Sequence, residues 1–389
     1  MIHRRLCVLG VAAIVASAAC SARGQIEQPA PQSAAAPRLG PGTVCRYRTG
    51  AVITASRGAV RNINAMVAAP LECPEQTVQT VDEDISPTVK DFRYRMLNGD
   101  GARQMLISIP GLANGDVGRA VVTYEVVTHT ILPPLDPSLL TLPSRRDKEA
   151  KRYLNPSPYI EVGHRHIRRA VEEALAALEE EENDESATDA EDEPSAGDAA
   201  DKATDSDEAA AADAAEAGAT AGEKDDKAAV ATAAEAESTE PAAEPTIWEE
   251  VEALYDYTLD HVKYEEGVDK SAVQVLGEGV GDCQAIGALF VAMCRTHKVP
   301  ARLVWVHDHQ YAEFYLADET GEGHWYPIET AGTPAFGEMR IPRVILQKGD
   351  NFRVKERRGE KLRYASDFLT GLPTPGGGKP SVKYIREPL

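Results

Sequence analysis

One stretch of the chain constrains the fold more than any other. It runs from Gly281 to Thr330 and contains a cysteine, a histidine and a carboxylate in that order, Cys283, His309 and Glu329. Cys283 opens an apolar run with helical periodicity, His309 opens a run with strand character, and Glu329 closes the next such run. The stretch therefore predicts an α+β domain in which a helix that begins at the cysteine packs on an antiparallel sheet.

Cys283 lies at the predicted N-terminus of this helix. The N–H groups of a first helical turn have no partner within the helix, and the helix dipole favours negative charge there, so a thiolate is stabilised. Gly281 allows the chain to approach closely, and Asp282 can cap the helix. The structural alternative is a small buried cysteine, which is common in helices. Cys294, at the far end of the same helix, fits that description better.

The histidine and the carboxylate are expected to meet across two strands. Side chains alternate along a strand, and the run that ends at Glu329 can return antiparallel to the run that begins at His309. Glu329 would then hold the His309 ring by a hydrogen bond, as thiol acyl-transfer chemistry requires. His307 and Asp308 are competing candidates for the base and the orienting acid.

A metal site is the alternative from a different class of function. Its ligands would be His307, His309, His324 and Glu329. Their spacing matches no strong zinc motif. We therefore expect no metal ion, and no cofactor is implied.

The acidity of the chain belongs to one segment, residues 179–245. Between Glu179 and Glu244 there are 24 Asp and Glu against 3 Lys, which accounts for the whole formal net charge of −21. The segment cannot bury enough apolar surface to offset chain entropy and is predicted to be disordered, with a solvated Ala-rich helix as the alternative. Its charge could attract cations or basic partners. The rest of the chain shows no basic excess, which argues against nucleic-acid binding.

The first 24 residues have the pattern of an export signal. Basic residues precede an apolar run that is too short to span a membrane stably, and small residues precede a cleavage position before Gln25. Cys20 offers lipidation as an alternative. The protein is therefore expected in the periplasm or outside the cell, where the compartment is oxidising. Cys45 and Cys73 are then expected to form a disulfide, with two separate buried thiols as the alternative.

The domain organisation follows from shifts in composition and pattern. Short strand-like runs with turn signals between them predict an N-terminal β-sandwich, and a Pro- and Ala-rich linker precedes it. The expected segments are a linker at 25–42, a β-sandwich-like domain at 43–135, a connecting loop and lead-in helix at 136–178, the acidic insert at 179–245, a core at 246–333 and a C-terminal extension wrapped on that core at 334–389.

The motifs between Trp248 and Thr330 resemble the transglutaminase-like superfamily. The family pattern is Gly-x-Cys at a helix start, a Pro-Ala/Thr-Arg strand, His-x-Trp-x-Glu, and Trp followed four residues later by Asp. The corresponding segments here are Gly281-Asp282-Cys283, Val299-Pro300-Ala301-Arg302, His309-Gln310-Tyr311-Ala312-Glu313 and Trp325-Tyr326-Pro327-Ile328-Glu329. Two positions depart from the pattern, because Tyr311 replaces Trp and Glu329 replaces Asp.

The resemblance implies a papain-like domain, as in exported bacterial members, and a set of roles. Cys283 would be the nucleophile, His309 the base and Glu329 the orienting acid of a cysteine-dependent peptidase, amidase or acyltransferase acting on a protein or peptide. Hydrolysis is favoured over cross-linking because water is abundant and no amine site can be read from the sequence. The family also contains non-catalytic members, so a silent binding or assembly module is the alternative.

Overall fold

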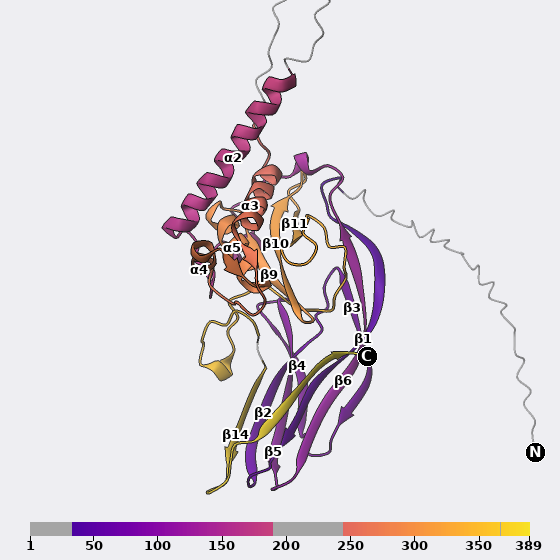
Figure 1. The fold of residues 1–389 in the computed structure, drawn as a ribbon. Helices are drawn as coiled ribbons and strands as arrows, with labels where there is room; N and C mark the ends of the chain where they lie inside the picture. The colour runs from indigo at the N-terminus through magenta and orange to yellow at the C-terminus, as the bar shows by residue number, and fades with distance from the viewer. Residues whose placement is uncertain (1–32, 190–243, 366) are drawn as a thin grey trace, which may run out of the picture.

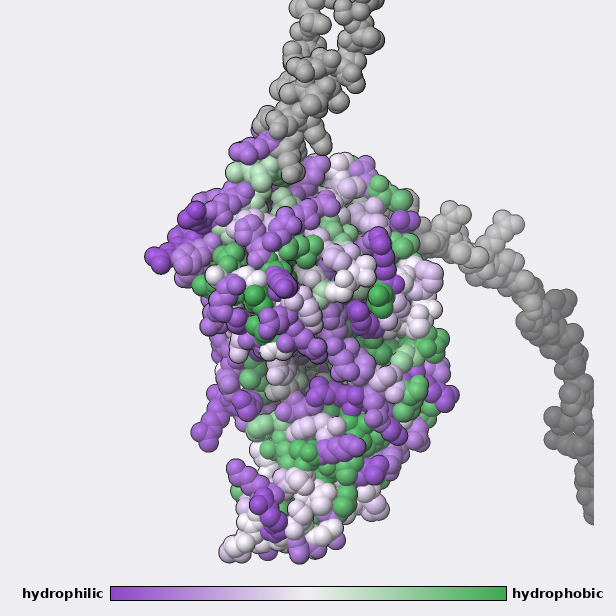
Figure 2. Space-filling model, in the orientation of Figure 1, coloured by the Kyte–Doolittle hydropathy of each residue, from purple (hydrophilic) through white to green (hydrophobic). Residues whose placement is uncertain are grey.

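The computed structural model describes residues 33–189, 244–365 and 367–389. The predicted export signal and residues 190–243 of the acidic insert lie outside them. Figure 1 shows two lobes, an upper one in which helices α2 to α5 gather around β9 to β11 and a lower one formed by the N-terminal strands with β14. On the face shown in Figure 2, hydrophilic side chains dominate the upper lobe, and a hydrophobic band crosses the lower lobe.

The lower lobe is a β-sandwich, as the strand-like runs predict. Its first sheet has the strand order β15-β1-β6-β3, and all pairs are antiparallel. Strands β2 and β5 belong to the second sheet, which faces the first. Inward side chains of the two sheets, such as Ile63, Met105 and Val122, form a common core. The strands of the lobe are β1 (Arg38–Thr54), β2 (Val60–Ala69), β3 (Gln76–Ile85), β4 (Asp91–Leu97), β5 (Ala102–Leu112), β6 (Val117–Leu132), β14 (Phe368–Pro373) and β15 (Ser381–Pro388).

The upper lobe packs one apolar helix, α5 (Cys283–Thr296), on an antiparallel sheet. Every residue of α5 from Ala285 to Arg295 is buried, which explains why its apolar pattern extends around the whole helix. The sheet strands are β9 (Ala301–Val306), β10 (His309–Ala317), β11 (Gly323–Glu329) and β12 (Ala335–Phe336). The smaller elements are α1 (Lys148–Arg152), α2 (Arg165–Asp189), α3 (Ile247–His261), α4 (Ala272–Glu278), β7 (Lys263–Tyr264), β8 (Val280–Gly281) and two short 3₁₀ turns (Pro137–Leu139 and Lys355–Arg357).

The C-terminal extension is not a peripheral wrap, and this corrects the expectation for residues 334–389. Strand β13 (Ile345–Lys348) pairs with β9 on one side and β5 on the other, so a single sheet runs through both lobes in the order β12-β11-β10-β9-β13-β5-β2-β14. Buried Lys348 pairs with Glu75 at 2.9 Å and with Glu313 at 2.8 Å, which joins the N-terminal lobe, the core and the extension. Such pairings connect segments that are distant in sequence, so local patterns do not reveal them.

Two other expected boundaries shift. Strand β1 begins at Arg38, inside the expected linker at 25–42. Helix α2 continues to Asp189, beyond the expected start of the disordered insert at 179. The added residues of α2 begin with Glu179, a strong helix former, and extending an existing helix costs less than nucleating a new one.

The expected Cys45–Cys73 disulfide is wrong, because both cysteines are free thiols. Cys45 lies on β1 opposite Val126 of β6, and β6 separates β1 from β3. Cys73 lies just before β3, where its backbone forms an isolated antiparallel β-bridge with Gln76. Two strand spacings are about 10 Å, which exceeds the Cα–Cα distance of about 7 Å that a disulfide can span. The two cysteines therefore lie in the same lobe but are too far apart to form a disulfide.

Within the described residues, no helix has both the length and the apolar character that crossing a membrane requires.

Candidate active site

The start of α5 is built as a capped helix terminus with the cysteine in its first turn. One carboxylate oxygen of Asp282 accepts hydrogen bonds from the backbone N–H groups of Gln284 and Ala285, both at 3.0 Å. The backbone N–H of Cys283 takes part neither in these capping hydrogen bonds nor in the i→i−4 hydrogen bonds of the helix. Glycine is required at 281, because a Cβ there would lie 2.5 Å from Cγ2 of Val275. The local expectations for Gly281 and Asp282 are therefore met.

His309 and Glu329 lie side by side on adjacent strands. Nε2 of His309 is 2.9 Å from Oε1 and 2.8 Å from Oε2 of Glu329. The antiparallel register pairs Ala312 of β10 with Ile328 of β11, which places Glu329 on the same face of the sheet as His309. The thiol of Cys283 lies close enough to the His309 ring to interact with it electrostatically. Because Nε2 is committed to Glu329, Nδ1 is the ring nitrogen that remains for the thiol.

The electrostatics of His309 favour the imidazolium. Burial by itself would lower the pKa of the ring. The interactions of the ring with Cys283 and Glu329 outweigh burial and raise the pKa of His309 from 6.5 to about 9. An imidazolium next to the thiol is therefore the state of His309 that this environment stabilises.

Glu329 is itself held in place from three directions. Nη1 of Arg343 donates to Oε2 at 3.3 Å, and the backbone N–H of Ala331 donates to Oε1 at 3.1 Å. The hydroxyl of Tyr255 donates to the Glu329 carbonyl at 2.8 Å. Arg343 was missed by sequence reasoning because it lies in the C-terminal extension, and no local motif marks it.

The site opens into a cleft between the lobes with a volume of about 370 Å³. Cys283, Gln284, His309 and Gln310 line it from the upper lobe, and Tyr47 and Arg386 line it from the β-sandwich. A second cavity of about 290 Å³ adjoins it, since both are lined by Trp305, Val306, Leu346 and Arg386. The β-sandwich therefore forms one wall of the space in front of the thiol, which sequence reasoning did not anticipate.

The competing candidates for base and acid are placed elsewhere in the cleft. Nδ1 of His307 lies 3.2 Å from the hydroxyl of buried Tyr47, and its Nε2 lies 3.2 Å from Asp308. The side chain of Asp308 is 88% exposed, so it is not positioned as a rigid orienting group. His309 with Glu329 is the pair that the structure assembles next to Cys283.

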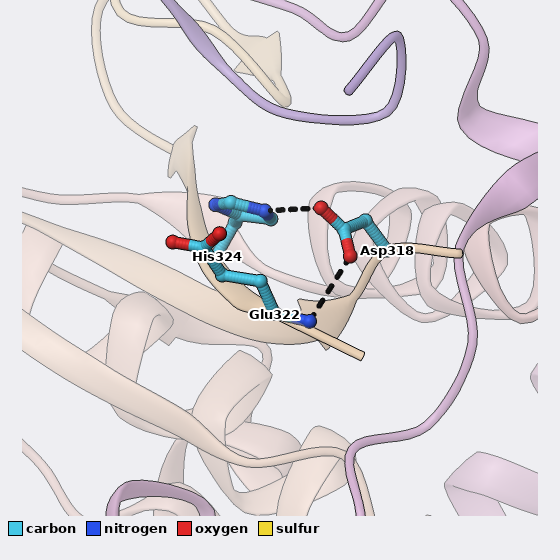
Figure 3. Close-up of side chains that lie close together, drawn as sticks. All are labelled: Asp318, Glu322 and His324. Carbon is cyan, nitrogen blue, oxygen red and sulfur yellow. Dashed lines mark hydrogen bonds and ion pairs between the residues drawn. The ribbon is translucent and has the colours of Figure 1, made fainter. Parts of the chain in front are cut away.

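The four residues of the alternative metal site are not brought together in the described part of the chain. His324 instead lies near Asp318 and Glu322, around the turn that joins β10 to β11 (Figure 3). Oδ2 of Asp318 is 2.9 Å from Nε2 of His324, and Oδ1 accepts the N–H groups of Thr320 and Glu322. Desolvation alone would raise the pKa of Asp318, but hydrogen bonds from the Thr320 hydroxyl, from His324 and from the two backbone N–H groups outweigh it and lower the pKa to about 2. Closing the turn is sufficient to explain this cluster.

A cavity larger than this cleft lies elsewhere in the upper lobe. It has a volume of about 550 Å³ between α2 and α3, and none of Cys283, His309 and Glu329 lines it. Carboxylates such as Glu173, Glu249 and Asp256 dominate its polar groups. Volume alone therefore does not identify the site, whereas the convergence of thiol, imidazole and carboxylate does.

Comparison with known proteins agrees with the geometry of the upper lobe. The family described as "Transglutaminase-like superfamily" matches residues 230–330, which include Cys283, His309 and Glu329. The chain contains a transglutaminase-like domain. The fold also aligns with the crystal structure of a Cytophaga hutchinsonii protein described as a candidate cysteine protease, at 14% identity and a TM-score of 0.48, over 91% of this chain and 92% of that one. The sequence matches no curated protein.

Other motif residues of the transglutaminase-like domain support the sheet. Arg302 pairs with buried Glu313 at 2.7 Å and lies over the ring of Trp325 at 3.7 Å. Tyr311, which stands where the family has Trp, is buried at the junction of the two lobes with Val306 and other apolar side chains. These contacts join β9, β10 and β11 and so fix the position of β10, the strand that begins at His309.

A second missed residue, Arg363, contacts the start of helix α5. Its Nη2 donates to the carbonyl of Gln284 at 2.6 Å, and its Nη1 pairs with Asp269. Its guanidinium lies 4.5 Å from the ring of Tyr159. The extension therefore contacts both the helix that carries the thiol and, through Arg343, the carboxylate.

Proposed function

We propose that the protein is an exported cysteine-dependent amide hydrolase of the peptidase or amidase type. The observation that carries the proposal is the convergence of Cys283, His309 and Glu329, in which one imidazole is hydrogen-bonded to the carboxylate and lies within electrostatic reach of the thiol. Nucleophile, base and orienting acid in this order are the parts that acyl transfer through a thioester needs.

In the proposed reaction, the thiolate of Cys283 attacks the carbonyl carbon of an amide and a C–S bond forms. The imidazolium of His309 gives its proton to the amine as the C–N bond breaks, which leaves a thioester on Cys283. His309 then takes a proton from water as that water attacks the thioester. The acid product leaves as the C–S bond breaks, and the thiolate–imidazolium pair is restored. Glu329 keeps the ring oriented and stabilises its positive charge whenever the ring is protonated.

A protein or peptide is the substrate class that this proposal favours. The cleft in front of Cys283 is lined from both lobes and continues into the adjoining cavity, so it offers an extended surface rather than an enclosed pocket. Residues 1–24 are proposed to direct export to the periplasm or beyond. The acidic segment is proposed to attract cations or basic partners.

The test is cleavage of a diverse peptide library, read as new peptide termini, by the wild-type protein and by Cys283→Ala. The wild type should generate termini that the variant does not. Labelling of Cys283 by a thiol-directed probe should be lost in the same variant. A folded wild-type protein that is labelled at Cys283 but cleaves nothing in the library and forms no acyl-enzyme would favour the binding or assembly module instead.

A further inference from the structure

Gln310 is a buried amide with no hydrogen-bond partner among the described residues. It is 1% exposed, and neither its Nε2 nor its Oε1 is bonded. A buried polar group without a hydrogen bond reduces stability, so an amide in this position calls for an explanation. The residue follows His309 directly in β10.

The amide of Gln310 faces the cleft that contains the nucleophile. Side chains alternate along β10, so Gln310 shares a face with Ala312 and Phe314, which pack in the same apolar core as α5. It lines the same cavity as Cys283. Its Nε2 lies against Gly287 of α5. Residues i and i+4 share a helix face, so Gly287 lies one turn further along α5 on the same face as Cys283.

Gly287 makes room for this amide. A Cβ at position 287 would lie 3.0 Å from Nε2 of Gln310, which is tighter than ordinary contact. Glycine inside a helix is less stabilising than alanine, because it loses more backbone freedom on folding. Two features that reduce stability, an unbonded amide and a helical glycine, therefore meet one helical turn from the nucleophile. Function accounts for both if the amide bonds to something that enters the cleft.

We propose that Nε2 of Gln310 and the backbone N–H of Cys283 together bind the substrate carbonyl oxygen in the covalent adduct. This inference rests on the proposed function. When Sγ attacks, a C–S bond forms and the π electron pair of the carbonyl moves onto oxygen. The two N–H donors stabilise that charge until the π bond re-forms and the amine leaves with the proton of His309. Gln310 is then a catalytic residue, because it touches a reacting atom.

Trp305 offers the rival donor. It lies directly opposite Gln310 in the β9–β10 pairing, and its Nε1 is also buried without a partner in the described structure. Its ring packs on Tyr364 with 4.8 Å between centroids, and it also lines the adjoining cavity. Gln310 is favoured because its amide lies against the catalytic helix itself.

Two probes separate this role from thiol activation. Iodoacetamide reacts with Cys283 by displacement at a tetrahedral carbon, so no charge develops on a carbonyl oxygen. p-Nitrophenyl acetate acylates the same thiol through an oxyanion. Gln310→Met removes the donor and keeps a side chain of similar length. We expect this variant to be acylated about 10²- to 10³-fold more slowly, with alkylation at the wild-type rate and pH profile.

Trp305→Phe is the matched comparison, because it removes the other unpartnered N–H and keeps the ring. Gly287→Ala is a second route to the same effect, since its methyl group displaces the Gln310 amide without changing it. It should slow acylation but not alkylation, although by less than Gln310→Met. Unchanged alkylation also shows that each variant is folded.

Three results would overturn the assignment. Wild-type acylation rates in Gln310→Met would remove Gln310 from the reaction. A loss confined to Trp305→Phe would transfer the role to the indole. A wild-type protein that iodoacetamide alkylates at Cys283 but p-nitrophenyl acetate never acylates would contradict the proposed function itself, and the inference with it.

Discussion

Arg343 donates a hydrogen bond from Nη1 to Oε2 of Glu329 at 3.3 Å, so a residue beyond the family match at 230–330 fixes the carboxylate that holds His309. The segment that contains Arg343 leads directly into β13, the strand that joins the two lobes. The precision of the candidate site therefore depends on the sheet that connects the lobes, and not on the transglutaminase-like domain alone.

Replacing Arg343 with glutamine should loosen Glu329 without unfolding the protein, because the Arg343 side chain is partly exposed. We expect alkylation of Cys283 at pH 6 to slow by roughly fivefold, corresponding to about 1 kcal/mol for one hydrogen bond. Arg340→Gln is the matched control, since Arg340 pairs with Glu338 at the surface. Equal rates for the two variants would show that Arg343 does not position the carboxylate.

Removing the carboxylate at position 329 should have a larger effect than removing its arginine. Glu329→Gln should slow alkylation of Cys283 below neutral pH, because the imidazolium loses its charged partner. His309→Ala should be more severe, since the cation next to the thiolate is lost. Glu329→Asp should retain more activity than Glu329→Gln, because it keeps the charge and restores the family residue. The measurement is the alkylation rate as a function of pH. Coincident curves for all four proteins would mean that Cys283 is not coupled to His309.

The His309 ring should titrate well above an ordinary histidine. The folded protein raises its pKa from 6.5 to about 9, so it holds the proton more tightly than the unfolded chain does. The stabilisation from this proton is complete below pH 6.5 and is lost as the pH rises through about 9. NMR of the ring should show a midpoint near pH 9, and Glu329→Gln should lower it. A wild-type midpoint near 6.5 would contradict the ion pair.

The four described cysteines should react very differently in the native protein. Cys283 is partly accessible and should be alkylated first. Cys294 is fully buried, and burial raises the pKa of its thiol, so it should stay unmodified. Burial likewise raises the pKa of Cys73 to about 12. After unfolding without reductant, Cys45 and Cys73 should both be free, as peptide mapping can check. A Cys45–Cys73 linked peptide would contradict the strand arrangement, and preferential labelling of Cys294 would contradict the site.

Local sequence patterns determined the parts of the site that neighbours in the chain control. Helical periodicity with Gly281 and Asp282 in front placed Cys283 at a helix start, and strand alternation placed His309 and Glu329 on one face of adjacent strands. These features depend on short-range geometry, namely a capped helix terminus and a hairpin of two strands. The resemblance to the transglutaminase-like superfamily rests on the same local motifs.

Only the tertiary structure decided which distant segments complete the site. Arg343 and Arg363 come from an extension whose strands enter both sheets, and Tyr47 comes from the sandwich. It also separated Cys45 from Cys73 and placed the amide of Gln310 against Gly287. Sequence alone determined what each segment can form. Strand order and packing depend on contacts across long sequence separations, which no local period encodes, and these contacts decided what each segment meets.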